Sequence, residues 1–181
     1  MPTVMTHAVV GAGLGVLYTS RKMPATFWLT TVALTMLPDL DVLAFRLGIA
    51  YEAPLGHRGL THSLLFALLA ACTAALLTHR RIGGRLPDLC GFLFLVTASH
   101  GLLDAFTDGG QGVGFFLPFD DRRYFFPWRP IRVSPIGYHF LSQRGLETLW
   151  SELLWVWLPT AAVVGTVLLH RYYWRVRRNS P

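Results

Sequence analysis

The chain has 181 residues, of which 52% are apolar and 14% are charged, and its formal net charge is +6. Because a soluble domain carries about 25% charged residues, this composition excludes a soluble globule, a disordered chain, a coiled coil and a secreted disulfide scaffold. Asp, Glu, Lys and Arg are absent from five runs, at 1–20, 23–38, 59–79, 89–103 and 153–170. Since about 20 residues cross the hydrocarbon core of a bilayer, we predict a single polytopic membrane domain over residues 1–181.

The charge-free runs predict an all-α bundle of about five transmembrane helices, expected near residues 4–20, 24–47, 60–79, 86–106 and 148–171. Pro38 lies inside the second helix and cannot donate a backbone hydrogen bond, so we expect a break there. Residues 107–147 form a loop rich in Gly, Pro, Arg and aromatic side chains. This loop is too long for a simple connection, and we predict that it is a lid or an element at the membrane interface.

Basic residues in the short loops predict how the chain is oriented in the membrane. Three segments on one side of a five-helix protein carry Arg21 and Lys22, Arg80, Arg81 and Arg85, and Arg171, Arg175, Arg177 and Arg178. The positive-inside rule makes that side cytoplasmic, and the C-terminus with it. The same rule accounts for the excess positive charge, so we expect the lipid bilayer as a partner and no nucleic acid.

Seven ionisable side chains lie within or beside the predicted helices: His7, Asp39, Asp41, His57, His62, His100 and Asp104. Ionisable groups inside a membrane are costly and usually functional. Each of the seven falls toward the outer end of its helix, so four antiparallel helices bring all of them to the same leaflet. This convergence is independent of the absolute orientation, and it predicts one site near the outer face.

The types and spacing of these residues point to a divalent metal ion. His100 and Asp104 are four residues apart and share one face of a helix. Asp39 and Asp41 follow Pro38, and an unwound backbone would let both face one site. Imidazole combined with carboxylate favours zinc, manganese or iron over magnesium or calcium. Seven candidate ligands exceed the four of a closed zinc site, so we expect one or two ions that keep open positions for water.

The densest polar motif, His57-Arg58-Gly59-Leu60-Thr61-His62-Ser63, precedes a predicted helix N-terminus, which favours anions. A guanidinium binds phosphate through two parallel hydrogen bonds, so Arg58 is a candidate catalytic and substrate-binding residue. Arg122 and Arg123 of the long loop are candidates for binding the same phosphate. Asp41 is the candidate general base or metal-bridging carboxylate.

Four motifs in this order resemble the YdjM-like family of inner-membrane proteins, which are regarded as metal-dependent hydrolases: Thr6-His7, Leu37-Pro38-Asp39-Leu40-Asp41, the His57–Ser63 motif and His100-Gly101-Leu102-Leu103-Asp104. The resemblance covers nearly the whole chain and extends into Phe125-Phe126-Pro127-Trp128-Arg129-Pro130. It implies an inner-membrane location and a distant similarity to zinc-dependent phospholipase C and the single-strand nucleases.

As metal ligands, the resemblance implies His7, one Asp of the 39/41 pair, His57 or His62, and the His100/Asp104 pair. Those soluble enzymes have a second His-x-x-x-Asp/Glu motif on a helix. Here His139 is followed four residues later by Gln143. We therefore expect one or two ions and not three, with zinc preferred over manganese or iron.

These observations predict a membrane hydrolase that directs metal-activated water at a phosphoester of a lipid or lipid-linked molecule. The alternative is a metal-ion or proton translocator, which also needs buried Asp and His. That alternative requires polar residues through to the inner face, whereas the inner halves of the first, third and fifth helices are almost purely apolar. A scaffold whose metal only joins the helices is a third interpretation, and its metal would lack an open position.

Overall fold

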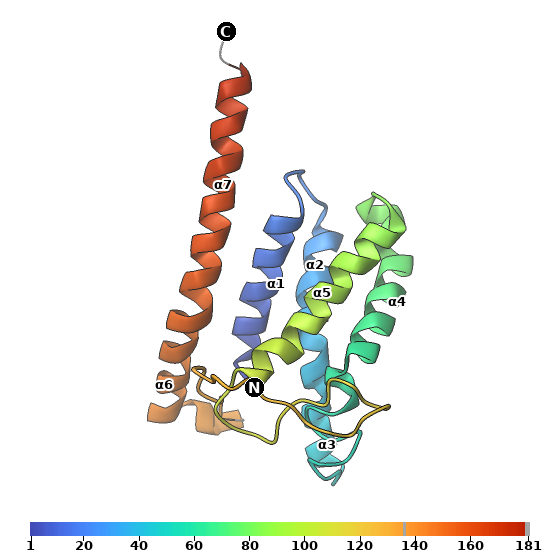
Figure 1. Ribbon diagram of the computed structural model, residues 1–181, viewed down its shortest axis with the longest axis vertical. Coiled ribbons are helices and arrows are strands. Elements are labelled where there is room, and N and C mark those ends of the chain that lie inside the picture. Colours follow the sequence, from blue (N-terminus) through green and yellow to red (C-terminus); the bar gives the residue numbers. More distant parts are fainter. Residues whose placement is uncertain (136, 180–181) are drawn as a thin grey trace.

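The computed structural model describes residues 1–135 and 137–179, and over these residues the protein is helical and contains no strand (Figure 1). The α-helices are α1 (Val4–Tyr18), α2 (Ala25–Met36), α3 (Leu43–Arg46), α4 (Leu64–Ile82), α5 (Leu86–Ala105), α6 (Gln143–Glu152) and α7 (Leu158–Asn179). Three short 3-10 segments, η1 (Leu37–Val42), η2 (Leu60–His62) and η3 (Gly137–Phe140), and one π-helical turn, η4 (Leu153–Trp157), complete the chain.

The expected number of apolar helices is confirmed. Four are long and apolar enough to cross a membrane, at Ala25–Arg46, Leu64–Ile82, Leu86–Ala105 and Gln143–Arg178. The fifth, α1, is apolar but has 15 residues, which makes it about 22 Å long and shorter than the hydrocarbon core. As expected from Pro38, the second helix is not continuous, because η1 separates α2 from α3. The last helix begins earlier than predicted, since α6 and η4 lead directly into α7.

An apolar core fills the half of the bundle that carries the short connections. α4 packs along α5, α1 packs along α2, and α2 packs on α5, whereas α7 packs mainly on α1 (Figure 1). The buried core comes from α2, α4 and α5: Phe27, Leu34, Ala71, Ala75, Ile82, Leu89, Phe92, Leu93 and Val96. Polar side chains are therefore displaced to the other end of these helices.

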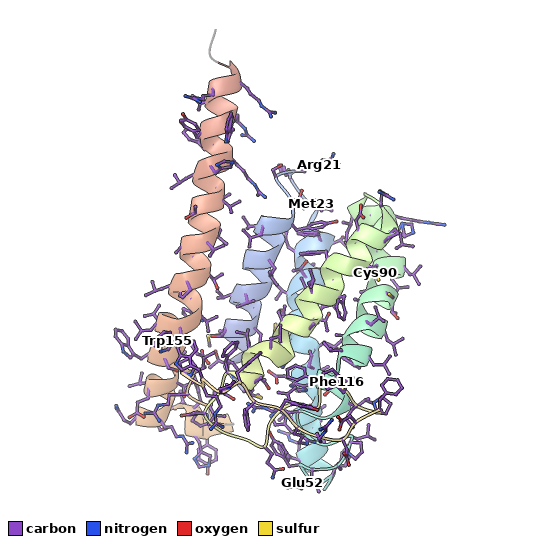
Figure 2. All side chains as sticks on the ribbon, viewed as in Figure 1. Arg21, Met23, Glu52, Cys90, Phe116 and Trp155 are labelled. Atoms are coloured by element: carbon purple, nitrogen blue, oxygen red, sulfur yellow. The ribbon has the colours of Figure 1, made fainter. Side chains whose placement is uncertain are left out.

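The basic segments lie at the end opposite the long loop, as the sequence predicts. The loop that contains Arg21 is at one end of the bundle, and Glu52 is at the other (Figure 2). Arg171 fixes α7 to this basic end, because its guanidinium donates hydrogen bonds to the carbonyl oxygens of Val16, Leu17 and Thr19 at the C-terminus of α1. That this end faces the cytoplasm stays a prediction of the positive-inside rule.

Residues 107–135 fold back over the polar end of the bundle. Val113, Leu117 and Ile131 of this loop are buried. The carbonyl oxygen of Phe115 accepts a hydrogen bond from the backbone N–H of Leu64, at the start of α4. The loop therefore covers this end of the molecule with packed side chains, and its opening as a lid stays a prediction.

Glycine in α1 allows α2 to approach closely. A Cβ atom on Gly11 would lie 2.7 Å from Cγ2 of Thr35, so any side chain must push the two helices apart. We expect Gly11→Ala to lower the free energy of unfolding by about 1–3 kcal/mol and the melting temperature by several degrees. The matched control is Gly91→Ala in α5, because a Cβ atom there meets nothing within 4 Å. Equal melting temperatures of the two variants in detergent would contradict this account of the α1–α2 contact.

Candidate metal centre

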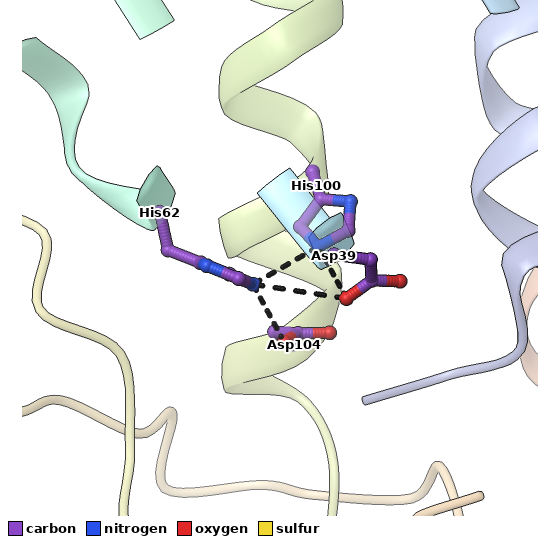
Figure 3. Close-up of side chains that lie close together, drawn as sticks. All are labelled: Asp39, His62, His100 and Asp104. Carbon is purple, nitrogen blue, oxygen red and sulfur yellow. Dashed lines mark hydrogen bonds and ion pairs between the residues drawn. The ribbon is translucent and has the colours of Figure 1, made fainter. Parts of the chain in front are cut away.

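Asp39, His62, His100 and Asp104 converge at the polar end of the bundle, and one ligand atom of each lies within 4.8 Å of the others (Figure 3). The Nε2 atoms of His62 and His100 are 3.0 Å apart. Oδ1 of Asp39 lies 3.3 Å from His100 Nε2, and Oδ2 of Asp104 lies 3.4 Å from His62 Nε2. Ligand atoms of a tetrahedral zinc ion are about 3.3 Å apart, given bonds of about 2.0–2.2 Å. The four side chains therefore have the spacing of a metal site.

The carboxylates of this group are buried without the hydrogen bonds that burial normally requires. Both oxygens of Asp39 and both of Asp104 accept no hydrogen bond from the residues that the structure describes, although the guanidinium of Arg58 forms an ion pair with Oδ2 of Asp104. Asp104 is fully buried, and Asp39 is 8% exposed. Buried carboxylates are normally hydrogen-bonded, paired or bound to metal. The residues present thus fit a divalent ion of the zinc, manganese or iron type.

The orientation of His100 suits a metal ligand. Its Nδ1 lies 2.6 Å from the carbonyl oxygen of Thr35. Because a carbonyl oxygen only accepts, Nδ1 carries the proton and Nε2 presents its lone pair to the other three side chains. His100 and Asp104 lie one turn apart on α5 and both face the group, as their spacing predicts.

Asp39 and Asp41 do not face one site; they diverge across η1 and bracket His62. Oδ1 of Asp39 lies 3.9 Å from Nε2 of His62, whereas Oδ2 of Asp41 lies 3.1 Å from its Nδ1. A carboxylate at the outer nitrogen of a ligating imidazole fixes its tautomer and ring orientation. Asp41 therefore lies behind His62 and outside the four-residue group, because a 3-10 segment keeps side chains two residues apart on different faces. Its role as a metal-bridging carboxylate or general base stays a prediction.

Asp41 joins the whole His57–Ser63 motif through hydrogen bonds. Oδ1 lies 2.6 Å from Nδ1 of His57. Oδ2 accepts from the backbone N–H of Arg58 and from Oγ1 of Thr61, at 3.0 and 2.7 Å. His57 is thus bound to Asp41 and lies outside the four-residue group, although it was a candidate ligand. Ser63 caps α4 through a hydrogen bond from the N–H of Phe66.

Arg58 is buried within the protein, in a backbone conformation that is rare for a residue with a side chain. Its φ is 60° and its side chain is 1% exposed. Nε lies 2.9 Å from Oδ2 of Asp104, and the two terminal nitrogens donate to the carbonyl oxygen of Gly109 and to Oγ1 of Thr107. The guanidinium that we expected to bind phosphate is therefore already engaged by Asp104 and by the start of the long loop.

The two candidate arginines of the long loop differ in their surroundings. Arg123 donates to the carbonyl oxygens of His57 and Tyr51, and so fastens the loop to the motif. The side chain of Arg122 is 76% exposed and forms a salt bridge with Asp120. Its hydrogen bonds lower the pKa of Asp120 below the usual range. Of the two, only Arg122 presents its guanidinium to the surface beside the site.

His7 lies at the edge of the four-residue group. Its ring is fully buried and stacks on that of His100, with centroids 3.7 Å apart and planes at 14°. Behind it, the fully buried carboxylate of Glu152 accepts hydrogen bonds from Thr3 and Thr6, which fixes the N-terminus of α1. All seven candidate residues thus lie at one end of the bundle, five in or beside the group and two behind it.

Sequence reasoning missed two residues that hold this arrangement. Glu152 anchors the helix that carries His7, and its signal was its place as the last acidic residue before the charge-free run 153–170. Thr107 accepts from Arg58 and donates to the carbonyl oxygen of Asp104. A single threonine after a helix gives no comparable signal, because threonine is common at helix ends.

Comparison with known proteins assigns the chain to a family. A model of the YdjM inner membrane protein family matches residues 1–177. The chain is 40% identical to inner membrane protein YbcI of Escherichia coli over 178 residues, which cover 98% of this chain and 100% of that protein. It is 28% identical to human alpha-L-iduronidase over 137 residues, only 21% of that protein. No solved structure matches the chain at a significant level. The chain thus belongs to the family of YdjM inner membrane proteins.

Proposed function

We propose that this protein is a metal-dependent hydrolase of the inner membrane that cleaves a phosphoester of a lipid or lipid-linked molecule. The observation that carries the proposal is the buried group of Asp39, His62, His100 and Asp104, whose carboxylates lack hydrogen-bond partners among the described residues. A divalent ion held by these four residues would activate a water molecule near neutral pH and would supply positive charge next to the phosphoryl oxygens.

The residues around the group have separate roles in this proposal. Asp41 keeps His62 in the tautomer that directs Nε2 at the ion, and the carbonyl oxygen of Thr35 does the same for His100. Arg58 neutralises one negative charge of Asp104 and connects it to the long loop. Four protein ligands still leave room for water, because manganese and iron accept more than four ligands and zinc can expand to five.

A lipid substrate is favoured by the surface that surrounds this end of the bundle. Large apolar side chains of the covering loop are exposed, including Phe116 at 48%, Phe119 at 83% and Trp128 at 57%. Phe116 lies at the polar end of the bundle (Figure 2). Exposed aromatic side chains are typical of the headgroup level of a membrane. Arg122 lies on the same loop with its guanidinium exposed, and an exposed guanidinium there could pair with phosphate headgroups.

The alternative of ion translocation is disfavoured by the apolar half of the bundle. A path from the polar group to the basic end would run between α2, α4 and α5. There Phe27, Leu93 and Val96 are fully buried and belong to one packed core. This core offers no sequence of titratable side chains along which a proton or ion could move.

The proposal predicts phosphate release that depends on metal. Protein loaded with zinc or manganese would be incubated in mixed micelles with phosphatidic acid, a lipid pyrophosphate and phosphatidylglycerol, and released phosphate and headgroup measured. We expect Asp104→Asn to lower the rate of hydrolysis by at least ~10³-fold, because the substitution removes a ligand of the proposed metal ion. Arg122→Ala should raise KM and leave kcat close to that of the wild type, as expected for a surface substrate contact. Equal rates for wild-type protein and Asp104→Asn on all three substrates would contradict a hydrolase of this class.

A further inference from the structure

Asp39 and Asp104 each direct their two oxygens at different imidazole rings. Oδ1 of Asp39 lies 3.3 Å from Nε2 of His100, and Oδ2 of Asp39 lies 4.0 Å from Nε2 of His7. Oδ2 of Asp104 lies 3.4 Å from Nε2 of His62, and its Oδ1 lies 3.6 Å from Nε2 of His7. Each carboxylate thus faces one ring of the His62/His100 pair with one oxygen and His7 with the other.

His7 has no other partner that would explain its position. Its side chain is fully buried, and neither ring nitrogen makes a hydrogen bond to any residue that the structure describes. Buried imidazoles ordinarily donate or accept at least once. Thr3, Thr6 and Glu152 fix the beginning of α1, so the inward direction of His7 is set by the surrounding structure and leaves Nε2 facing the two carboxylates.

The stacking of His7 on His100 matches the spacing of paired metal ions. The two ring centroids are 3.7 Å apart and the planes are nearly parallel. Nε2 of His7 faces Asp39 and Asp104, and Nε2 of His100 faces the other oxygen of Asp39. Parallel rings with this separation direct their lone pairs at two neighbouring points. Metal ions that share bridging ligands in hydrolytic sites are about 3.5–4 Å apart.

We propose that His7 Nε2, Asp39 Oδ2 and Asp104 Oδ1 form a second divalent-ion subsite, and that both carboxylates bridge it to the first ion. This inference rests on the proposed function for that first ion. Three protein ligands leave the second subsite open, which suits an exchangeable water or a phosphoryl oxygen of the substrate. The first subsite has four protein ligands and is the more closed of the two.

Charge balance suggests how the two subsites would differ. Asp39, Asp41 and Asp104 carry three negative charges in the buried region, and Arg58 contributes one positive charge, which leaves two negative charges. One divalent ion neutralises the remainder, whereas a second leaves an excess of two positive charges. A phosphate dianion would remove that excess. The second ion should therefore bind more weakly than the first, and inorganic phosphate should strengthen it selectively.

The test is a metal titration of the full chain in detergent after stripping with a chelator. We expect the wild type to bind two equivalents of zinc and His7→Ala to bind one. Inorganic phosphate should raise the affinity for the second ion at least tenfold and leave the affinity for the first unchanged. His170→Ala, in the exposed part of α7, is the matched control and should keep two. Manganese-loaded wild type should also give the electron paramagnetic resonance spectrum of a coupled pair, and His7→Ala that of an isolated ion.

The possible failures are distinguishable. One equivalent in both the wild type and His7→Ala overturns the second subsite and leaves the proposed function standing. One equivalent whose affinity falls in His7→Ala makes His7 a fifth ligand of a single ion, and this also overturns the subsite. No metal in the wild type overturns both proposals. His7→Gln, which retains a polar side chain of similar length, replaces His7→Ala if the alanine variant loses its helical circular dichroism.

Discussion

Replacing His100 by alanine should deprive the purified protein of its metal. His100 supplies Nε2 at the centre of the four-residue group, 3.0 Å from that of His62 and 3.3 Å from Oδ1 of Asp39. Without it the remaining ligands cannot enclose an ion, so we expect zinc or manganese content after reconstitution to fall at least tenfold. The measurement is metal per chain by elemental analysis, with His170→Ala as a control for the loss of an exposed histidine.

Asp41→Asn should give a smaller and more informative effect. An amide cannot offer two acceptor oxygens to His57, Arg58, Thr61 and His62, so the tautomer and orientation of His62 would relax. Loss of such an outer partner typically lowers metal affinity about 10–100-fold. We expect a weaker site with unchanged stoichiometry. A wild type that takes up no zinc, manganese, iron or nickel would refute the site, and unchanged affinity in Asp41→Asn would refute the role assigned to Asp41.

Arg58→Ala should be the most destabilising single substitution at the polar end. It leaves Asp104 fully buried with an uncompensated charge, and it removes the hydrogen bonds to Gly109 and Thr107. Breaking a buried ion pair by removing one partner costs about 3–5 kcal/mol. For a chain of this size, that loss lowers the melting temperature by on the order of 10 °C. Thermal unfolding of metal-free protein in detergent would measure it.

Three further variants separate the causes of this loss. Arg122→Ala is the matched control, because its guanidinium is exposed and paired only at the surface, and we expect almost no change. Arg58→Gly should have a higher melting temperature than Arg58→Ala, since glycine adopts the φ of 60° without strain. Arg58→Ala combined with Asp104→Asn should recover part of the loss, because the unpaired charge is gone. If Arg58→Ala and the wild type have the same melting temperature, the ion pair does not contribute to stability.

Helix number and the convergence of the polar residues follow directly from the sequence. Both depend on the hydropathy of each segment and on the fact that successive membrane helices run in opposite directions. These are properties of whole segments. The break after Pro38 was also predictable, because proline removes one specific hydrogen bond. The separate roles of Asp39 and Asp41 were not, since they depend on how η1 is wound and on which face meets His62. Residue type alone cannot distinguish a carboxylate that binds a metal from one that orients a ligand.

Arg58 shows a second limit of sequence reasoning. Its place between two histidines at a helix start favours phosphate binding, and nothing in the sequence indicates that Asp104, 46 positions later, takes up its charge. The packing of the long loop brings Thr107 and Gly109 to the same guanidinium. Contacts between a loop and a distant motif depend on the tertiary arrangement, so they are invisible to local patterns.

The candidate ligands come from four separate segments, namely α1, η1, η2 and α5, so a bound ion would cross-link most of the bundle. An ion that binds only the folded chain adds stability that grows with its free concentration, about 2.7 kcal/mol at a hundredfold excess over Kd. Folded and unfolded populations would then shift with the supply of that ion in the compartment that the site faces. In cells starved of the metal, a larger fraction of the chain would be exposed to membrane proteases, so protein abundance would follow metal availability before any change in transcription.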